Sequence, residues 1–241
     1  MAPPVPPSFP AAPPPAGEPG LGALSARYES GGRGPGTVSS GQGDPGGVSY
    51  GLYQLASGTG ALAAFLAGEG ARWATELGAA APGSAGFTAC WQAIARREPE
   101  AFAAAQHGFI ARTHYAPLAA ALRARTGLDL ARHSAALRAV CWSCAVQHGA
   151  AARLVVAAIA TVDAACARTA ADYDARLIRA IYAERGAYVT RLAARLGGAA
   201  GDTLRTVASR RYPAECAAAL AMLPPAAPPA GLAARPTASS A

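Results

Sequence analysis

The sequence predicts a mainly α-helical domain that carries a small β or loop region near its N-terminal end. Hydrophobic residues make up 52% of the chain, and much of that fraction is alanine, a strong helix former. The alanine-rich pattern is interrupted between residues 31 and 51, where glycines are dense. Glycine is costly in regular structure unless the backbone needs positive φ or close approach. This stretch is therefore expected to place something specific on a helical scaffold.

Both ends of the chain have a different composition from the centre. Residues 1–20 and 223–241 are rich in proline, and neither segment has enough apolar surface to fold, so both are expected to be disordered. The remaining stretch, residues 21–222, is expected to be one folded domain, long enough to bury a core.

The N-terminal part of this domain is expected to be irregular. Leu21, Leu24 and Tyr28 share one helix face, and the glycines after Glu29 end that short helix. Turn signals follow one another through residues 33–47. Residues 48–55 are predicted to be extended, with odd-numbered and even-numbered side chains on opposite sides, in a sheet of two or three strands or an ordered loop.

Everything after residue 56 is predicted to be helical. The expected helices are one capped by Ser57, one through Trp73 and Leu77, one over 84–97, one with Pro99 in its first turn that Pro117 kinks or ends, one capped by Ser134 and ending near His148, and others over 151–161, 163–182, 187–196 and 202–209.

Charge and hydropathy exclude some partners. The net charge is +7, and every basic residue is arginine, which indicates a composition bias. The arginines form no run and do not alternate with aromatic residues, so no nucleic-acid partner is expected. Their diffuse positive field would favour an anionic polymer. The chain has no long apolar run and no signal-peptide pattern, so we expect no membrane insertion and delivery by a separate apparatus.

The five cysteines are expected to act as small buried hydrophobic residues. Cys141 and Cys144 would share one helix face. A local disulfide or redox pair stays open for them, but no second pair or histidine at zinc spacing accompanies them. The sequence also lacks a phosphate-binding loop, a G-x-S-x-G elbow and an H-E-x-x-H motif. No metal or cofactor is expected.

Two carboxylates lie in the glycine-lined region, Glu29 and Asp44. Glu29 is expected at a helix C-terminus, where the helix dipole disfavours an ionised carboxylate and so suits a proton donor. Glycoside hydrolysis needs such a donor and usually a second carboxylate, which Asp44 would supply. The plainer alternatives are an exposed glutamate at a helix end and a turn-forming aspartate before Pro45.

A second cluster is Gln147 and His148, which would form a wall of a substrate cleft or simply end a helix. His107 and His114, on or near helices, are interpreted as structural.

Residues 28–31 (Y-E-S-G), the glycine-rich loop and residues 49–55 (S-Y-G-L-Y-Q-L) together resemble the lysozyme-like superfamily. The string G-D-P-G-G-x-S-Y-G-x-Y-Q is most similar to lysozyme-like domains of phage-tail and type VI secretion proteins, which act on peptidoglycan. This resemblance covers about residues 21–60. It matches Glu29 to the general acid/base and Tyr50, Gly51 and Gln54 to the cleft lining.

The resemblance implies cleavage of the β-1,4 bond between N-acetylmuramic acid and N-acetylglucosamine. Asp44 would orient or deprotonate water, and the glycan would be held by four residues: Ser49, Tyr50, Tyr53 and Gln54. The spacing from Glu29 to Gln54 is longer than in ordinary lytic transglycosylases, so hydrolysis and transglycosylation both stay open.

Partners implied are peptidoglycan or a related glycan, with secretion-spike or phage-tail proteins as further candidates. The alternatives are a non-catalytic glycan-binding or spike adaptor and a chitosanase- or chitinase-like hydrolase.

Overall fold

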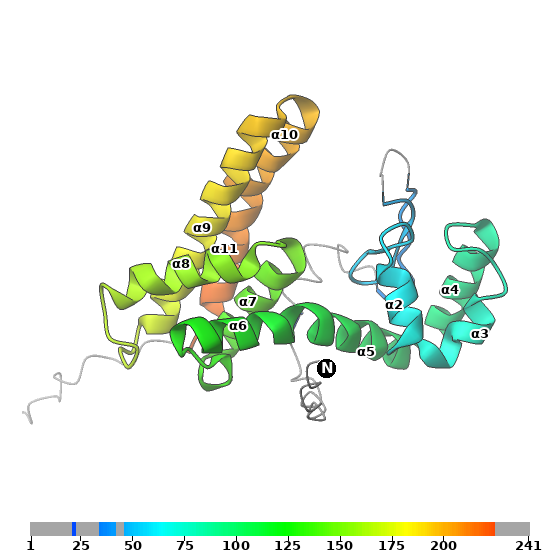
Figure 1. Cartoon of the computed structure of the whole chain (residues 1–241), viewed down its shortest axis with the longest axis horizontal. Helices are drawn as coiled ribbons and strands as arrows, with labels where there is room; N and C mark the ends of the chain where they lie inside the picture. The colour runs from blue at the N-terminus through cyan, green and yellow to red at the C-terminus, as the bar shows by residue number, and fades with distance from the viewer. Residues whose placement is uncertain (1–20, 23–33, 42–45, 225–241) are drawn as a thin grey trace, which may run out of the picture.

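The computed structural model describes residues 21–22, 34–41 and 46–224, and these residues form two helical lobes joined by one long rod (Figure 1). The rod runs through α5 (Pro99–Ile110), a π-helical turn η2 (Ala111–Tyr115) and α6 (Ala116–Thr126). The N-terminal lobe comprises residues 34–41 and 46–110, and the C-terminal lobe comprises residues 116–224. The expectation of a mainly helical fold with a small sheet is confirmed.

A short hairpin lies at the start of the N-terminal lobe. Strand β1 (Ser49–Tyr50) pairs antiparallel with β2 (Leu55–Ala56), with Tyr50 opposite Leu55. Val38 adds an isolated bridge to Tyr50 from the other side. Residues 51–54 form the turn, so the continuous extended run predicted over residues 48–55 is wrong. Gly51 and Gln54 have positive φ (79° and 52°), and two left-handed residues reverse the chain within this short span.

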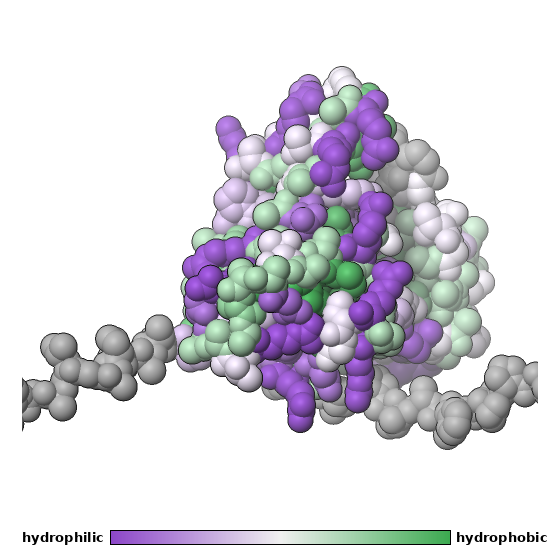
Figure 2. Space-filling view, turned by 60° about the vertical axis from the view of Figure 1, so that its left-hand side comes forward, coloured by the Kyte–Doolittle hydropathy of each residue, from purple (hydrophilic) through white to green (hydrophobic). Residues whose placement is uncertain are grey.

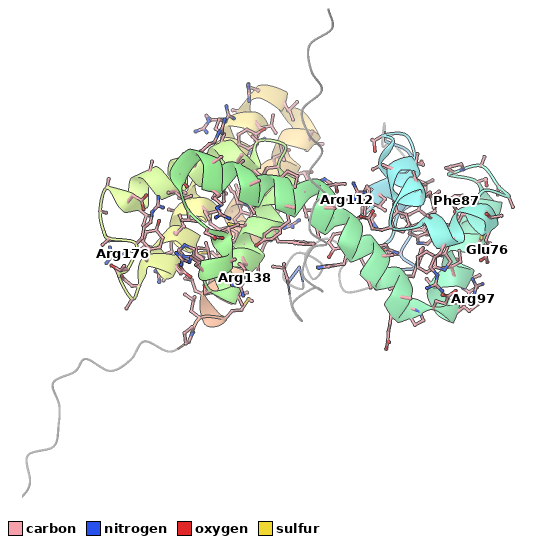
Figure 3. All side chains as sticks on the ribbon, turned by 60° about the horizontal axis from the view of Figure 1, so that its bottom comes forward. Glu76, Phe87, Arg97, Arg112, Arg138 and Arg176 are labelled. Carbon is pink, nitrogen blue, oxygen red and sulfur yellow. The ribbon has the colours of Figure 1, made fainter. Side chains whose placement is uncertain are left out.

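The rest of the N-terminal lobe is helical. It consists of α2 (Ala61–Ala67), η1 (Ala71–Trp73), α3 (Ala74–Leu77), α4 (Ala85–Arg97) and α5. Ser84 caps α4 by accepting from the amide of Phe87, and Pro99 lies in the first turn of α5 as predicted. At the far end of this lobe Arg97 donates two hydrogen bonds to Glu76, and the two side chains lie together in Figure 3.

The C-terminal lobe packs a long helical hairpin against two central helices. Its elements are α6, η3 (Leu130–Arg132), α7 (Ala135–Gln147), α8 (Ala151–Asp163), α9 (Tyr173–Leu196), α10 (Gly198–Thr206), the π turn η4 (Val207–Arg211) and α11 (Tyr212–Ala221). Helix α9 runs beside α10 and α11. These three helices project from the body as an arm (Figure 1). Ser134 caps α7 as predicted.

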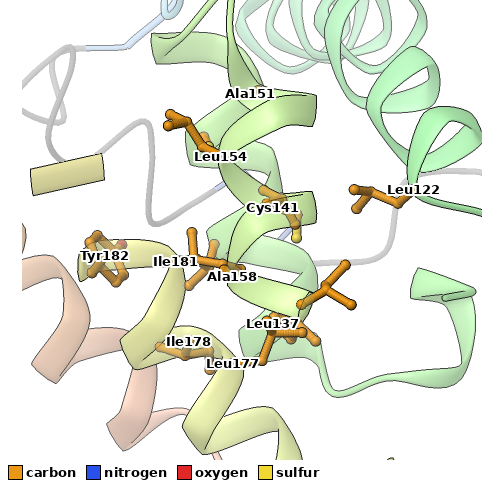
Figure 4. Close-up of a cluster of buried hydrophobic side chains, with 14 of the residues drawn as sticks. Leu122, Leu137, Cys141, Ala151, Leu154, Ala158, Leu177, Ile178, Ile181 and Tyr182 are labelled. Carbon is orange, nitrogen blue, oxygen red and sulfur yellow. The ribbon is translucent and has the colours of Figure 1, made fainter. Parts of the chain in front are cut away.

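The two lobes have separate hydrophobic cores. The N-terminal core is aromatic, and Phe65, Trp91 and Phe102 contact one another in it. The C-terminal core is mainly aliphatic and is built from α6 to α9, with Cys141 among the leucine and isoleucine side chains of Figure 4. Helix α7 serves both cores, because its Trp142 belongs to the aromatic one.

Several predicted helix boundaries are wrong for identifiable reasons. Helix α2 begins at Ala61, not after Ser57, because the amide of Ser57 bonds to Val48 and continues the hairpin. Helix α8 ends at Asp163, whose carboxylate accepts from Arg168 and from the Tyr173 hydroxyl, and this holds a connection before α9.

The chain stays helical at three positions where a break or a kink is expected. Helix α9 continues through Gly186, because buried side chains on both sides of this glycine fix the helix in place. Pro117 and Pro213 each follow a π turn and lie in the first turn of the next helix. The widened turns let the chain accommodate both prolines without ending the rod or the arm.

The face of the molecule shown in Figure 2 carries scattered hydrophilic side chains with apolar areas between them. Among the helices that the structure describes, none is long and apolar enough to cross a membrane.

Candidate functional site

A pocket of about 370 Å³ opens between the hairpin turn, α2, and the junction of α5 with η2. Two residues predicted to bind substrate, Tyr53 and Gln54, line it together with Thr59. The opposite wall comes from the rod and from α7: Phe109, Ile110, His114 and Val146. The pocket therefore combines an apolar wall with a few polar groups, as small-molecule and sugar sites commonly do.

Tyr53 is held by an aromatic cluster behind the pocket. Its hydroxyl lies 3.0 Å from Nδ1 of His107, and the His107 ring stacks on Trp142 with centroids 4.4 Å apart. Gly22 covers this cluster: a Cβ there would lie 3.0 Å from the Tyr53 hydroxyl and 3.1 Å from both other rings. Burial lowers the pKa of His107, so its imidazole is neutral at pH 7.

Gln54 completes the turn. Its side-chain amide donates to the carbonyl of Gly51 at 2.9 Å, which stabilises its own left-handed backbone. The Gln54 amide is thereby fixed at the pocket rim.

The buried side chain of Gln106 ties three segments to α5. Its Oε1 accepts from the amide of Leu52 at 2.9 Å, and its Nε2 donates to the carbonyl of Pro35 at 3.1 Å. The same carbonyl accepts from the indole N–H of Trp91. Gln106 therefore positions the hairpin turn and the chain that precedes it, and α4 joins them because its Trp91 donates to the same carbonyl.

The two predicted catalytic carboxylates, Glu29 and Asp44, lie outside the described residues. The chain on either side of each is described. Gly22 packs on the Tyr53 cluster and Pro35 bonds to Gln106. The amide of Gly58 donates to the carbonyl of Gly46, next to the segment that carries Asp44.

Two other predicted contact residues are buried in the structure. The ring of Tyr50 is 0% exposed and lies between Phe87 and Trp91. Its hydroxyl lies 3.1 Å from Thr88 and accepts from the amide of Gly83. Ser49 is 6% exposed and pairs with Ser39. In this arrangement Tyr50 offers no face for sugar stacking and instead supports the hairpin from behind.

Gln147 and His148 lie in a different environment from Tyr53 and Gln54. They belong to a buried polar network in the C-terminal lobe that centres on Arg185, which is 0% exposed. Arg185 donates to Gln147 at 2.6 Å, and the Tyr212 hydroxyl lies 3.0 Å from Nε2 of His148. The structure does not bring this pair into the pocket, although their neighbour Val146 lines it.

A buried glutamate balances the charge of this network. Glu215 accepts from Arg211 at 2.5 Å and lies 3.5 Å from Arg185. The Arg185 guanidinium lies between the rings of Tyr182 and Tyr212, 4.7 and 4.6 Å from their centroids. These contacts join α7, α9 and α11, so the network holds the arm to the body.

The described residues contain no cluster of three or more histidine, cysteine, aspartate or glutamate side chains that could hold a metal ion. All five cysteines are free, and burial raises the pKa of the Cys144 thiol to about 11. Cys141 and Cys144 thus pack as buried small side chains, as expected.

Sequence reasoning missed the functional setting of Gln106, His107 and His114. A glutamine and two histidines on one helical stretch carry no motif. Only the packing of α5 against the hairpin brings Gln106 to Leu52 and His107 to Tyr53, and His114 in η2 lines the same pocket as Tyr53. The spacing of Gln106 and His107 was the available signal, since consecutive helix residues reach two adjacent parts of an opposing loop.

Comparison with known families matches residues 21–209 to the family described as Type VI secretion system spike protein VgrG3-like, C-terminal. The match covers the pocket, the rod and most of the arm. The chain belongs to this family. A curated relative, the type VI secretion system spike protein VgrG3 of Vibrio cholerae serotype O1, is 43% identical over 95 residues. That segment is 39% of this VgrG3-like chain and 9% of the relative's length, so the chain matches a small part of a much longer protein.

Proposed function

We propose that this VgrG3-like domain cleaves the β-1,4 bond between N-acetylmuramic acid and N-acetylglucosamine in peptidoglycan. Glu29 is the general acid that protonates the glycosidic oxygen. Asp44 orients or deprotonates the attacking water. Tyr53 and Gln54 hold the sugars at the pocket, whereas Tyr50 and Ser49 act from behind by fixing the hairpin.

One observation carries most of this proposal. The described residues on either side of the segment that contains Glu29 contact two neighbouring residues of α5. Gly22 packs against His107, and Pro35 bonds to Gln106. Both anchors adjoin the hairpin turn that supplies Tyr53 and Gln54 to the pocket. The described residues on both sides of Glu29 therefore lie beside the pocket, which supports Glu29 as the acid of a glycoside-cleaving site there.

Membership of the spike-protein family supports a delivery route. A domain at the C-terminal end of a spike protein would be carried out by the secretion apparatus, so it needs no signal of its own. We propose delivery of this domain to the cell wall of a target cell in this way. Secretion-apparatus proteins are then its expected partners, together with peptidoglycan.

The products released from purified peptidoglycan test the proposal. Fragments with a free reducing end would establish a hydrolase, and Asp44→Asn should then reduce the rate by two or more orders of magnitude, because the water loses its orienting base. Fragments lighter by one water would identify a lytic transglycosylase, with Asp44→Asn costing little.

A third result would overturn the proposal. If the wild-type domain binds the polymer and releases no fragments, the domain is an adaptor rather than an enzyme. Release of chitosan or chitin fragments with no action on peptidoglycan would instead assign a different glycan.

A further inference from the structure

The π turn η2 places one histidine in the pocket without an evident structural task. This turn lies where α5 passes into α6, between the two lobes, and its residue His114 lines the pocket beside Ile110 and Val146. A π turn is costly in a long helix and is commonly retained where it serves a site. Here it places an imidazole in the lining of the pocket that Gln54 also lines.

The hydrogen bonds of the neighbouring Thr113 fix the tautomer of His114. The Thr113 hydroxyl donates to the carbonyl of Phe109 at 2.6 Å. It also lies 2.7 Å from Nδ1 of His114. A hydroxyl has a single hydrogen, and the carbonyl has none to give. Nδ1 of His114 must therefore carry the hydrogen and donate it to Thr113, which leaves Nε2 with a lone pair.

That lone pair has no donor among the residues that the structure describes. Arg112, the nearest cation in the turn, gives its guanidinium to Glu69 at 2.6 and 2.8 Å. The Gln54 amide donates to Gly51. His114 therefore presents an acceptor on a neutral ring to the pocket, since burial lowers the pKa of His114 below its usual range.

We propose that His114 is a specificity-determining residue whose Nε2 accepts a hydrogen bond from the N–H of an acetamido group on the bound glycan. The inference rests on the proposed glycan-cleaving function and specifies the sugar substituent that the pocket selects. An acetamido group carries one N–H next to a methyl, and the wall around His114 is apolar: Ala64, Phe109, Ile110 and Val146. A charged ammonium at the same sugar carbon would lose hydration there without a counter-charge.

Two substitutions at one position separate the acceptor from the Thr113 contact. In His114→Asn the side-chain amide can still donate to Thr113, but no atom reaches the position of Nε2. In His114→Gln the longer amide can place its oxygen near that position. We expect His114→Asn to raise KM for acetylated glycan about tenfold with kcat nearly unchanged, the effect of one lost hydrogen bond, and His114→Gln to restore most of it.

The probe is a set of soluble glycan fragments released from peptidoglycan by an unrelated muramidase, compared with the same fragments after N-deacetylation. Wild type should bind the acetylated set more tightly, and His114→Asn should lose most of that preference. Equal affinity of wild type for the two sets would overturn the inference, as would an unchanged preference in His114→Asn.

Nitrogen-15 NMR of the histidine rings gives a readout that does not depend on cleavage. The free wild-type domain should show His114 as the Nδ1–H tautomer, and acetylated fragments should shift its Nε2 resonance. Thr113→Val should weaken the tautomer preference. If no cleavage occurs but Nε2 shifts with acetylated fragments, the cleavage proposal fails and the acetamido site stands. If cleavage occurs but acetylated fragments leave the Nε2 resonance of His114 unchanged, the acetamido site alone is wrong.

Discussion

The side chain of Gln106 occupies the space beside Gly51 that any larger residue would need. A Cβ at position 51 would lie 2.2 Å from Oε1 of Gln106 and 2.7 Å from its Cδ. Gly51 also has φ of 79°, a left-handed conformation that glycine adopts without strain. This close approach lets Gln106 reach the amide of Leu52, and so it fixes the hairpin turn that supplies Tyr53 and Gln54.

Gly51→Ala should destabilise the domain by about 3 kcal/mol, from overpacking against Gln106 together with left-handed strain. Gly60→Ala is the matched control, because Gly60 has φ of 78° but no neighbouring atom within 4 Å of its Cβ position. It should cost only about 1 kcal/mol, the strain alone. Urea unfolding of both variants measures the difference, and equal losses would contradict the role assigned to Gln106.

Tyr50→Phe should lower stability by about 1–3 kcal/mol, because the contacts of the hydroxyl with Thr88 and Gly83 are lost from a fully buried site. Activity per folded molecule should stay the same. Tyr53→Phe is the comparison, since it removes the contact with His107 at the pocket and should change KM. If Tyr50→Phe stays folded but loses most of its activity, Tyr50 contacts the sugar directly and the supporting role assigned to it is wrong.

The helical part of the fold was predictable because its signals are local. Ser134 caps α7 and Pro99 begins α5, both as the sequence predicts. The hairpin turn was not predictable, because the left-handed conformation of Gln54 depends on a bond to Gly51 and on the approach of Gln106 from α5. Periodicity carries no information about such distant contacts.

The candidate site was predictable only in part. Tyr53 and Gln54 do line the pocket, where Tyr53 is 8% exposed, but Tyr50, three residues earlier, is 0% exposed and does not line it. The pattern of Gln147 and His148 indicated a cleft wall. In the structure both side chains instead form hydrogen bonds with the buried Arg185, 37 residues after His148. A buried charge draws nearby polar groups to itself, and the sequence gives no sign of which arginine is buried.

Arg185→Met should cost about 3–5 kcal/mol of stability, the usual consequence of removing one partner from a buried charge pair. Gln147, Ser143 and Glu215 would each lose a partner in the process. Arg179→Met is the control on the same helix, because Arg179 is exposed. Similar unfolding free energies for the two variants would show that the network does not hold the arm.

The free energy of unfolding should fall as the pH is lowered, and part of this loss should come from His148. Burial, with help from Arg185 and Arg211, lowers its pKa from 6.5 to about 4. Between pH 6.5 and about pH 4, His148 binds a proton in the unfolded chain but not in the folded protein. The free energy of unfolding therefore falls as pH falls through this window, and this contribution levels off below it. The loss amounts to about 3 kcal/mol.

His148→Gln isolates this contribution. The variant should lose less stability than wild type between pH 7 and pH 4.5, as measured by urea unfolding at each pH. The half-buried His107 and His114 change stability in the same direction but are common to both proteins, so they cancel. Parallel pH curves for the two proteins would contradict the buried, neutral state of His148.

The most direct test of the central claim is digestion of purified peptidoglycan by wild type and by Glu29→Gln, with soluble fragments identified by mass spectrometry. Glutamine preserves the size of the side chain and removes the transferable proton. The account predicts that wild type releases disaccharide-peptide fragments, whereas Glu29→Gln unfolds at the same urea concentration and releases none. Fragments from folded Glu29→Gln at the wild-type rate would contradict it.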